Sequence, residues 1–215
     1  MKPLVSILIP AYNAEKWIAE TIASARAQTW PNKEIIVVDD GSTDQTVSVL
    51  GQFASKSIKV VSQPNRGAAA ARNKAFSLCQ GDYIQWLDAD DLLSPDKIAR
   101  QIEAIKLFPD KRTLISCGWG SFYCRPKKAR FVRTGLWQDL TPVEWLLRKM
   151  IENIWMQPGT WLVSRELTEV AGPWDERLSL DDDGEYFCRV LLESRNIKFI
   201  DGPTVFYRIA GPQSL

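Results

Sequence analysis

The chain contains no histidine among its 215 residues. Catalysis by serine–histidine–aspartate or cysteine–histidine groups, zinc sites with imidazole ligands, and imidazole as a general base are therefore excluded. Any proton transfer must use an aspartate, glutamate, lysine or tyrosine side chain.

Cysteine is scarce, and long apolar runs are missing. The four cysteines, at positions 79, 117, 124 and 188, show neither the paired spacing of a metal site nor the density of a disulfide scaffold. They indicate reduced thiols and a cytoplasmic protein. No segment approaches the roughly eighteen apolar residues of a membrane span, and the apolar run at 4–9 lacks the cleavage site of a signal peptide. Any membrane contact would be peripheral, at the inner face.

An excess of charge of either sign is also missing. The 27 basic and 26 acidic residues are well mixed and leave a net charge of +1. No global field therefore favours nucleic acid as a partner. The densest basic run, Arg125 to Arg133, is short. We expect it to be either a solvated hairpin or a contact for an anionic acceptor or a lipid phosphate.

A hydrophobic content of 45% lets the chain bury one full core, so we predict a single domain over 1–215. In its first half, 1–112, apolar runs alternate with helical patterns. Ser42 and Gln45 fit a capping box, and Ser94 with Pro95 fits a helix start. The predicted strands are 4–9, 34–38, 58–62 and 83–87, and the predicted helices are 14–28, 42–54, 67–79 and 94–108.

This alternation predicts an α/β fold with a Rossmann-like, open and mostly parallel sheet. The second half, 113–215, is expected to be a smaller unit with mixed strands and helices that no longer alternate regularly. There we predict strands at 113–117, 157–163, 197–200 and 204–208, a hairpin at 121–133, and helices at 137–150, 165–170 and 183–193.

Polar residues follow three of the predicted parallel strands, at 10–13, 39–40 and 88–91. Ligands of such sheets bind outside the carboxyl ends of the strands, so the three clusters should face one crevice. In the last cluster, Asp88, Asp90 and Asp91 crowd three carboxylates into four residues. Carboxylates so close raise one another's pKa, and a divalent metal relieves the repulsion. A solvated acidic turn is the alternative.

Four blocks in this order resemble the family-two glycosyltransferases, an inverting group with the A-type glycosyltransferase fold. A weaker fifth block extends the resemblance over nearly the whole chain. The blocks are Ser6–Asn13, Val37–Asp44, residues 65–67 with 71–73, Leu87–Asp91, and Gly172–Glu185.

The resemblance implies a transferase that moves a sugar from a UDP- or dTDP-sugar to an acceptor hydroxyl. An aromatic Tyr12 offers a face for a nucleobase, and Asp39 offers an acceptor for a ring N–H. The alternative for Tyr12 is ordinary packing at a strand end, and the alternative for Asp39 is a structural role in the turn. Arg72 is placed to meet a diphosphate, with Arg66 as a competitor. The implied nucleotide-sugar residues are Pro10, Ala11, Tyr12, Glu15, Asp39, Gly67, Arg72, Asp88 and Ala89.

For the chemistry, the resemblance implies that Asp90 ligates Mn²⁺ or Mg²⁺ at the diphosphate, where the metal neutralises the leaving group. Asp91 would instead serve the loop. The catalytic base would be Asp183, with Asp182 as a competing assignment, and an acid-rich helix start is the non-catalytic alternative.

A carbohydrate or lipid-linked acceptor is implied for the second half, with Trp155 and Gly159 as candidate contacts. Residues 207–210 resemble a late Tyr-Arg-x-His element, but Ala210 stands in place of the histidine. Two other functions stay open. One is a binding module without catalysis, and the other is a sugar nucleotidyltransferase, although its Gly-rich signature is missing after Ile9.

Overall fold

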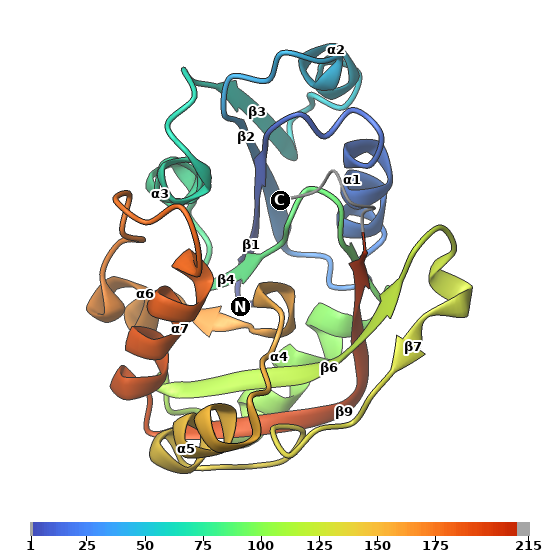
Figure 1. Cartoon of the computed structure of the whole chain (residues 1–215). Helices are drawn as coiled ribbons and strands as arrows, with labels where there is room; N and C mark the ends of the chain where they lie inside the picture. The colour runs from blue at the N-terminus through green and yellow to red at the C-terminus, as the bar shows by residue number, and fades with distance from the viewer. Residues whose placement is uncertain (1, 210–215) are drawn as a thin grey trace.

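A five-stranded sheet in the order β3-β2-β1-β4-β8 forms one half of the fold in the computed structural model, which describes residues 2–209 (Figure 1). Its first four strands are parallel, and β8 is an antiparallel edge. The strands are β1 (Val5–Ala11), β2 (Lys33–Asp39), β3 (Ile58–Ser62), β4 (Tyr83–Trp86) and β8 (Val163–Ser164). The predicted parallel sheet is therefore confirmed.

Helices cover both faces of this sheet because its central strands are apolar on both sides. All seven residues of β1 are buried. Leu8 and Ile36 point toward α3 (Ala68–Leu78), whereas Ile7 and Val37 pack with α1 (Ile18–Arg26) and α4 (Lys97–Leu107). The remaining crossover helix is the short α2 (Thr46–Gly51).

A second sheet, in the order β5-β9-β6-β7, lies beside the first (Figure 1). Its long strands β6 (Thr113–Phe122) and β9 (Asn196–Arg208) are parallel, while β5 (Leu92–Leu93) and β7 (Arg130–Phe131) pair antiparallel at the edges. The hairpin predicted at 121–133 is thus confirmed. The elements that surround this sheet are η1 (Pro126–Lys128), α5 (Pro142–Glu152), η2 (Pro158–Thr160), α6 (Arg165–Ala171) and α7 (Asp182–Glu193).

Three local predictions in the second half were wrong. The two strands predicted at 197–200 and 204–208 are one strand, β9, because a register shift against β6 absorbs the residues between them. In the segment 157–163, residues 158–160 form the 3₁₀ turn η2 because Pro158 opens a turn there, and of this segment only Val163 belongs to a named strand, β8. The helix predicted from Trp137 begins only at Pro142, where Thr141 and Glu144 form a capping box.

Two predicted helix starts were also wrong. Ser42 does not cap α2, because its hydroxyl instead accepts a hydrogen bond from the backbone N–H of Asn13. The α2 start is capped by Asp44, which accepts from Thr46. In the same way, the helix expected from Ser94 and Pro95 begins at Lys97.

A buried lysine joins α4 to the first sheet. Lys97 has no exposed surface, and its Nζ donates to the side-chain oxygens of Gln85 and Gln101. Those glutamines in turn donate to the carbonyl oxygens of Gly159 and Thr160, so the network fixes η2. Burial without a carboxylate partner lowers the pKa of Lys97 from its usual 10.5 to about 8.

This lowered pKa predicts a measurable pH dependence of stability. Between pH 8 and 10.5 Lys97 releases a proton in the folded state that it keeps in the unfolded state, so its contribution to the free energy of unfolding should rise with pH. The limiting slope is about 1.4 kcal/mol per pH unit. We expect the Lys97→Met variant to lack this rise in urea titrations at several pH values. An equal dependence of the unfolding free energy on pH in the wild type and in Lys97→Met would contradict the lowered pKa of Lys97.

Candidate functional site

The strands β1, β2 and β4 end at the same edge of the first sheet. Ala11 lies opposite Asp39 in the ladder, and the N–H of Leu87 donates to the carbonyl of Leu8. The predicted convergence of polar residues at the strand ends is therefore confirmed. Pro10 and Ala11 are buried in the strand end, whereas Tyr12 is 51% exposed and offers its ring to solvent.

The loop after β2 is shaped by Asp40 rather than by Asp39. The Asp40 carboxylate accepts hydrogen bonds from the Nε2 of Gln63 and from the backbone N–H groups of Arg66 and Gly67. Gly67 has a φ of +91°, a conformation that favours glycine, and α3 begins directly after it. Asp39 is buried and accepts from the N–H of Ser42 at 3.3 Å.

Glu15 and Ala89, two other residues predicted to bind the nucleotide sugar, make contacts that support the loops. The Glu15 carboxylate accepts from the N–H of Gln45 at 2.8 Å, so it supports the start of α2. Ala89 is half-buried in the acidic loop, and its carbonyl accepts from the hydroxyl of Thr21. These contacts anchor the loops after β1, β2 and β4 to one another and to the nearby helices.

Arg72 is neither solvated nor open toward a ligand. It is buried in α3 and donates to the Oδ1 of Asp88 at 2.9 Å and to the Oδ2 of Asp182 at 2.7 Å. Its guanidinium also lies 4.4 Å from the ring centroid of Trp174. Arg72 thereby ties the acidic loop after β4 to the first turn of α7, across the two halves of the chain. Arg66, the competing arginine, is exposed and pairs with Glu176.

The two adjacent aspartates in the first turn of α7, Asp182 and Asp183, have different contacts. Asp182 is occupied by the ion pair with Arg72, whereas Asp183 has no ion pair within residues 2–209 and accepts only from the N–H of Gly184. Burial, followed by repulsion from Asp88, raises the pKa of Asp183. A raised pKa makes this carboxylate a stronger base than an exposed aspartate.

The acidic loop contains a second group of this kind. Burial and the neighbouring charge of Asp88 raise the pKa of Asp90 to about 6. Its carboxylate accepts no hydrogen bond from another residue in the range 2–209. Oxygen ligands that repel one another and lack donors suit a hard divalent cation. Within the same range, no three acidic or thiol side chains converge to hold a metal by themselves.

Arg208 holds the other side of the acidic loop. This arginine of β9 is buried and donates through its backbone N–H to Asp91, through Nε to the carbonyl of Asp90, and through a terminal nitrogen to Glu20. Asp91 is fully enclosed, so it serves the loop rather than a ligand. No spacing in the sequence pairs Arg208 with residues more than a hundred positions earlier. The neighbouring Ala210 lies outside the described residues.

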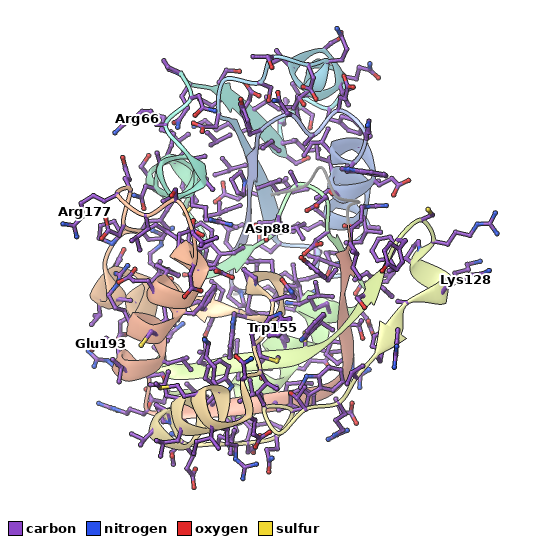
Figure 2. All side chains as sticks on the ribbon, viewed as in Figure 1. Arg66, Asp88, Lys128, Trp155, Arg177 and Glu193 are labelled. Carbon is purple, nitrogen blue, oxygen red and sulfur yellow. The ribbon has the colours of Figure 1, made fainter. Side chains whose placement is uncertain are left out.

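Aromatic side chains border the carboxylates on the second half. Trp155 is 55% exposed and lies near Trp119, with ring centroids 6.3 Å apart. Tyr207 contacts Trp119 edge to face, and its pKa is raised by burial and then by the charges of the nearby aspartates, Asp91 first. In Figure 2, Asp88 and Trp155 are both labelled near the middle of the view. Gly159, by contrast, is buried, and a Cβ there would lie 3.2 Å from Val205.

A parallel sheet with carboxylates at its strand ends and a second sheet beside it is the arrangement expected of the A-type glycosyltransferase fold. Family comparison agrees, because the model of "Glycosyl transferase family 2" matches residues 6–154. The chain belongs to this family and has the A-type glycosyltransferase fold.

Similar proteins include an uncharacterised glycosyltransferase of Rickettsia prowazekii, 35% identical over 84% of this chain and 56% of its own length. A putative teichuronic acid biosynthesis glycosyltransferase of Bacillus subtilis, TuaG, is 46% identical over 47% of this chain and 42% of its own. The chain thus spans little more than half the length of the first of these relatives.

Among solved structures, S. aureus TarS 1–349 in complex with UDP superposes with a TM-score of 0.80. The identity is 22%, and the match covers 98% of this chain and 61% of TarS 1–349. The same fragment in complex with UDP-GlcNAc has a TM-score of 0.79 over 98% of this chain and 60% of its own length. At this identity the likeness supports the fold alone.

The bridge made by Arg72 predicts an asymmetric response to loss of arginines. Arg72→Met should destabilise the protein by about 3–5 kcal/mol in urea unfolding, because two carboxylates lose their buried partner. The control is Arg177→Met, which removes an exposed arginine paired with Asp175 and should leave unfolding nearly unchanged. A similar loss of unfolding free energy in both variants would show that the buried ion pairs of Arg72 stabilise the protein no more than an exposed pair does.

Proposed function

We propose that the protein is a metal-dependent, inverting glycosyltransferase that moves a sugar from a UDP- or dTDP-sugar to an acceptor hydroxyl. One observation carries the proposal. Two half-buried carboxylates with raised pKa values, Asp90 and Asp183, flank a pair of aspartates that Arg72 neutralises. One acid is thus suited to a cation and the other to a proton.

The donor nucleotide would lie at the ends of β1 and β2. The exposed ring of Tyr12 can stack on a base, and the carboxylate of Asp39 can accept the ring N–H that uracil and thymine carry. The fold of TarS, solved with UDP and with UDP-GlcNAc, supports a nucleotide sugar as the ligand. Pro10, Ala11 and Gly67 would then border the nucleotide through backbone.

The metal, Mn²⁺ or Mg²⁺, would be held by Asp90 together with oxygens of the donor diphosphate, because the protein supplies too few ligands alone. Such an ion neutralises charge on a departing nucleoside diphosphate. Asp88 is fixed by Arg72 and would contact the ribose or the sugar with its other oxygen.

Asp183 would act as the base. It takes the proton from the acceptor hydroxyl while the oxygen forms a bond to the anomeric carbon, and the bond from that carbon to the diphosphate breaks. A single displacement of this kind inverts the anomeric configuration. Asp182 is a poorer candidate, because its Oδ2 is engaged by the guanidinium of Arg72 at 2.7 Å.

A carbohydrate acceptor, free or lipid-linked, would bind on the second half. The exposed indole of Trp155 beside Trp119 offers the apolar face on which sugar rings stack. The names of two relatives, TuaG and an Escherichia coli chondroitin synthase 45% identical over 45% of this chain and 14% of its own length, support a role in polysaccharide biosynthesis. No helix within residues 2–209 is long and apolar enough to span a bilayer. We place the enzyme in the cytoplasm, where nucleotide sugars would be its donors.

The metal assignment predicts that Asp90→Asn lowers the Mn²⁺-dependent affinity for UDP by at least about tenfold in calorimetry. The matched control is Glu103→Gln, which removes one negative charge from an exposed position of α4. UDP binding to Asp90→Asn that equals the wild type, with and without Mn²⁺, would remove the metal from this site.

The base assignment predicts a different phenotype for Asp183→Asn. UDP affinity should be kept, while transfer from a panel of UDP- and dTDP-sugars falls by about 10²- to 10⁴-fold. In the wild type, the rate should rise with pH through the raised pKa of Asp183, since only the deprotonated form accepts a proton. Asp182→Asn is the control and should retain more transfer activity than Asp183→Asn. Normal turnover of Asp183→Asn would move the base elsewhere.

A further inference from the structure

The hairpin between β6 and β7 projects from the body of the protein. It contains the turn η1 and ends in the two-residue strand β7, and Figure 1 shows it extending away from both sheets at the right of the view. In Figure 2, Lys128 at its tip lies at the rim of the molecule, well apart from Asp88. The hairpin is therefore not part of the donor site.

The charge of this hairpin is of one sign. From Tyr123 to Gln138 the sequence has five basic residues and no acidic one, although the whole chain is nearly neutral at +1. All five basic residues are exposed, and within residues 2–209 only Arg133 has an ion pair, at 3.7 Å from the exposed Asp201. The basic residues are Arg125, Lys127, Lys128, Arg130 and Arg133.

Apolar side chains stand among these cations. Tyr123, Phe131 and Val132 are 67%, 49% and 58% exposed. Phe131 is also anchored, because its ring covers Gly120 and meets Phe206 with centroids 6.3 Å apart. The hairpin is thus held against the second sheet while it presents both charge and apolar surface to the outside.

We propose that this hairpin, residues 123–133, is a docking surface for an anionic lipid bilayer. Clusters of four to eight lysines and arginines bind acidic headgroups, and interspersed aromatic and aliphatic side chains enter the headgroup boundary. A nucleic acid would use the cations but leaves the aliphatic Val132 without a partner. Docking is independent of sugar transfer, and it brings the enzyme to a surface where lipid-linked acceptors are found.

The test is sedimentation of the full chain with vesicles of phosphatidylcholine alone or with added phosphatidylglycerol. The variant carries Arg125→Ser, Lys127→Ser, Lys128→Ser and Arg130→Ser. The control carries Lys56→Ser, Lys59→Ser, Lys74→Ser and Lys106→Ser, four exposed lysines outside the hairpin. Both lose the same charge, and circular dichroism with UDP binding verifies that each is folded.

The wild type and the control should bind the acidic vesicles, weakly so in high salt, and not the neutral ones. Each cation removed from the hairpin should lower the partition coefficient about fivefold, so the hairpin variant, which lacks four of them, should bind roughly 600-fold more weakly. Replacing Tyr123 and Val132 by serine should weaken binding further at constant charge.

Equal binding by the hairpin variant and the control, or no vesicle binding by the wild type, would overturn the proposal. So would hairpin-dependent binding to single-stranded DNA or heparin that exceeds binding to vesicles, because the surface would then serve an anionic polymer. Transfer to a soluble acceptor should be the same for both fourfold variants, which separates docking from the proposed catalytic function.

Discussion

One buried guanidinium holds the carboxylate cluster together. Arg72 brings a positive charge between Asp88 of the loop after β4 and Asp182 at the start of α7, and Trp174 covers it. A buried cation with two carboxylate partners satisfies charges that would otherwise repel one another. The relative position of the two halves at the site depends on this contact, because the two aspartates are separated by more than ninety residues in the chain.

Arg208 has the complementary task on the other side of the loop, where it fixes Asp91 and the carbonyl of Asp90. Of the five neighbouring aspartates, Asp88 and Asp182 pair with the guanidinium of Arg72, whereas Asp91 meets only the backbone N–H of Arg208. Burial and like charge raise the pKa values of Asp90, Asp91 and Asp183, which have no cationic side-chain partner within residues 2–209. The electrostatic pattern of the site thus follows from which carboxylates Arg72 pairs with.

Sequence reasoning predicted what depends on local pattern. Apolar runs such as Leu4–Ile9 gave the parallel strands, and strand-end chemistry placed Tyr12, Asp39 and Asp88 at one edge. It failed where distant residues compete with local signals. Ser42 fits a capping box, yet Asn13 from the preceding loop takes its hydroxyl. Arg72 was expected at a diphosphate or in water, and its partners in α7 are invisible to spacing.

The choice between Asp182 and Asp183 shows why such contacts matter. Adjacent residues on a helix point about 100° apart, so only one of them can face Arg72. The other, Asp183, is left with a raised pKa, which makes it a stronger base than an exposed aspartate in a chain that has no histidine. The same burial that raises this pKa would be costly for five aspartates at once. Arg72 relieves that cost at Asp88 and Asp182, and of the three carboxylates that keep a raised pKa, Asp91 is enclosed while Asp90 and Asp183 are half-buried.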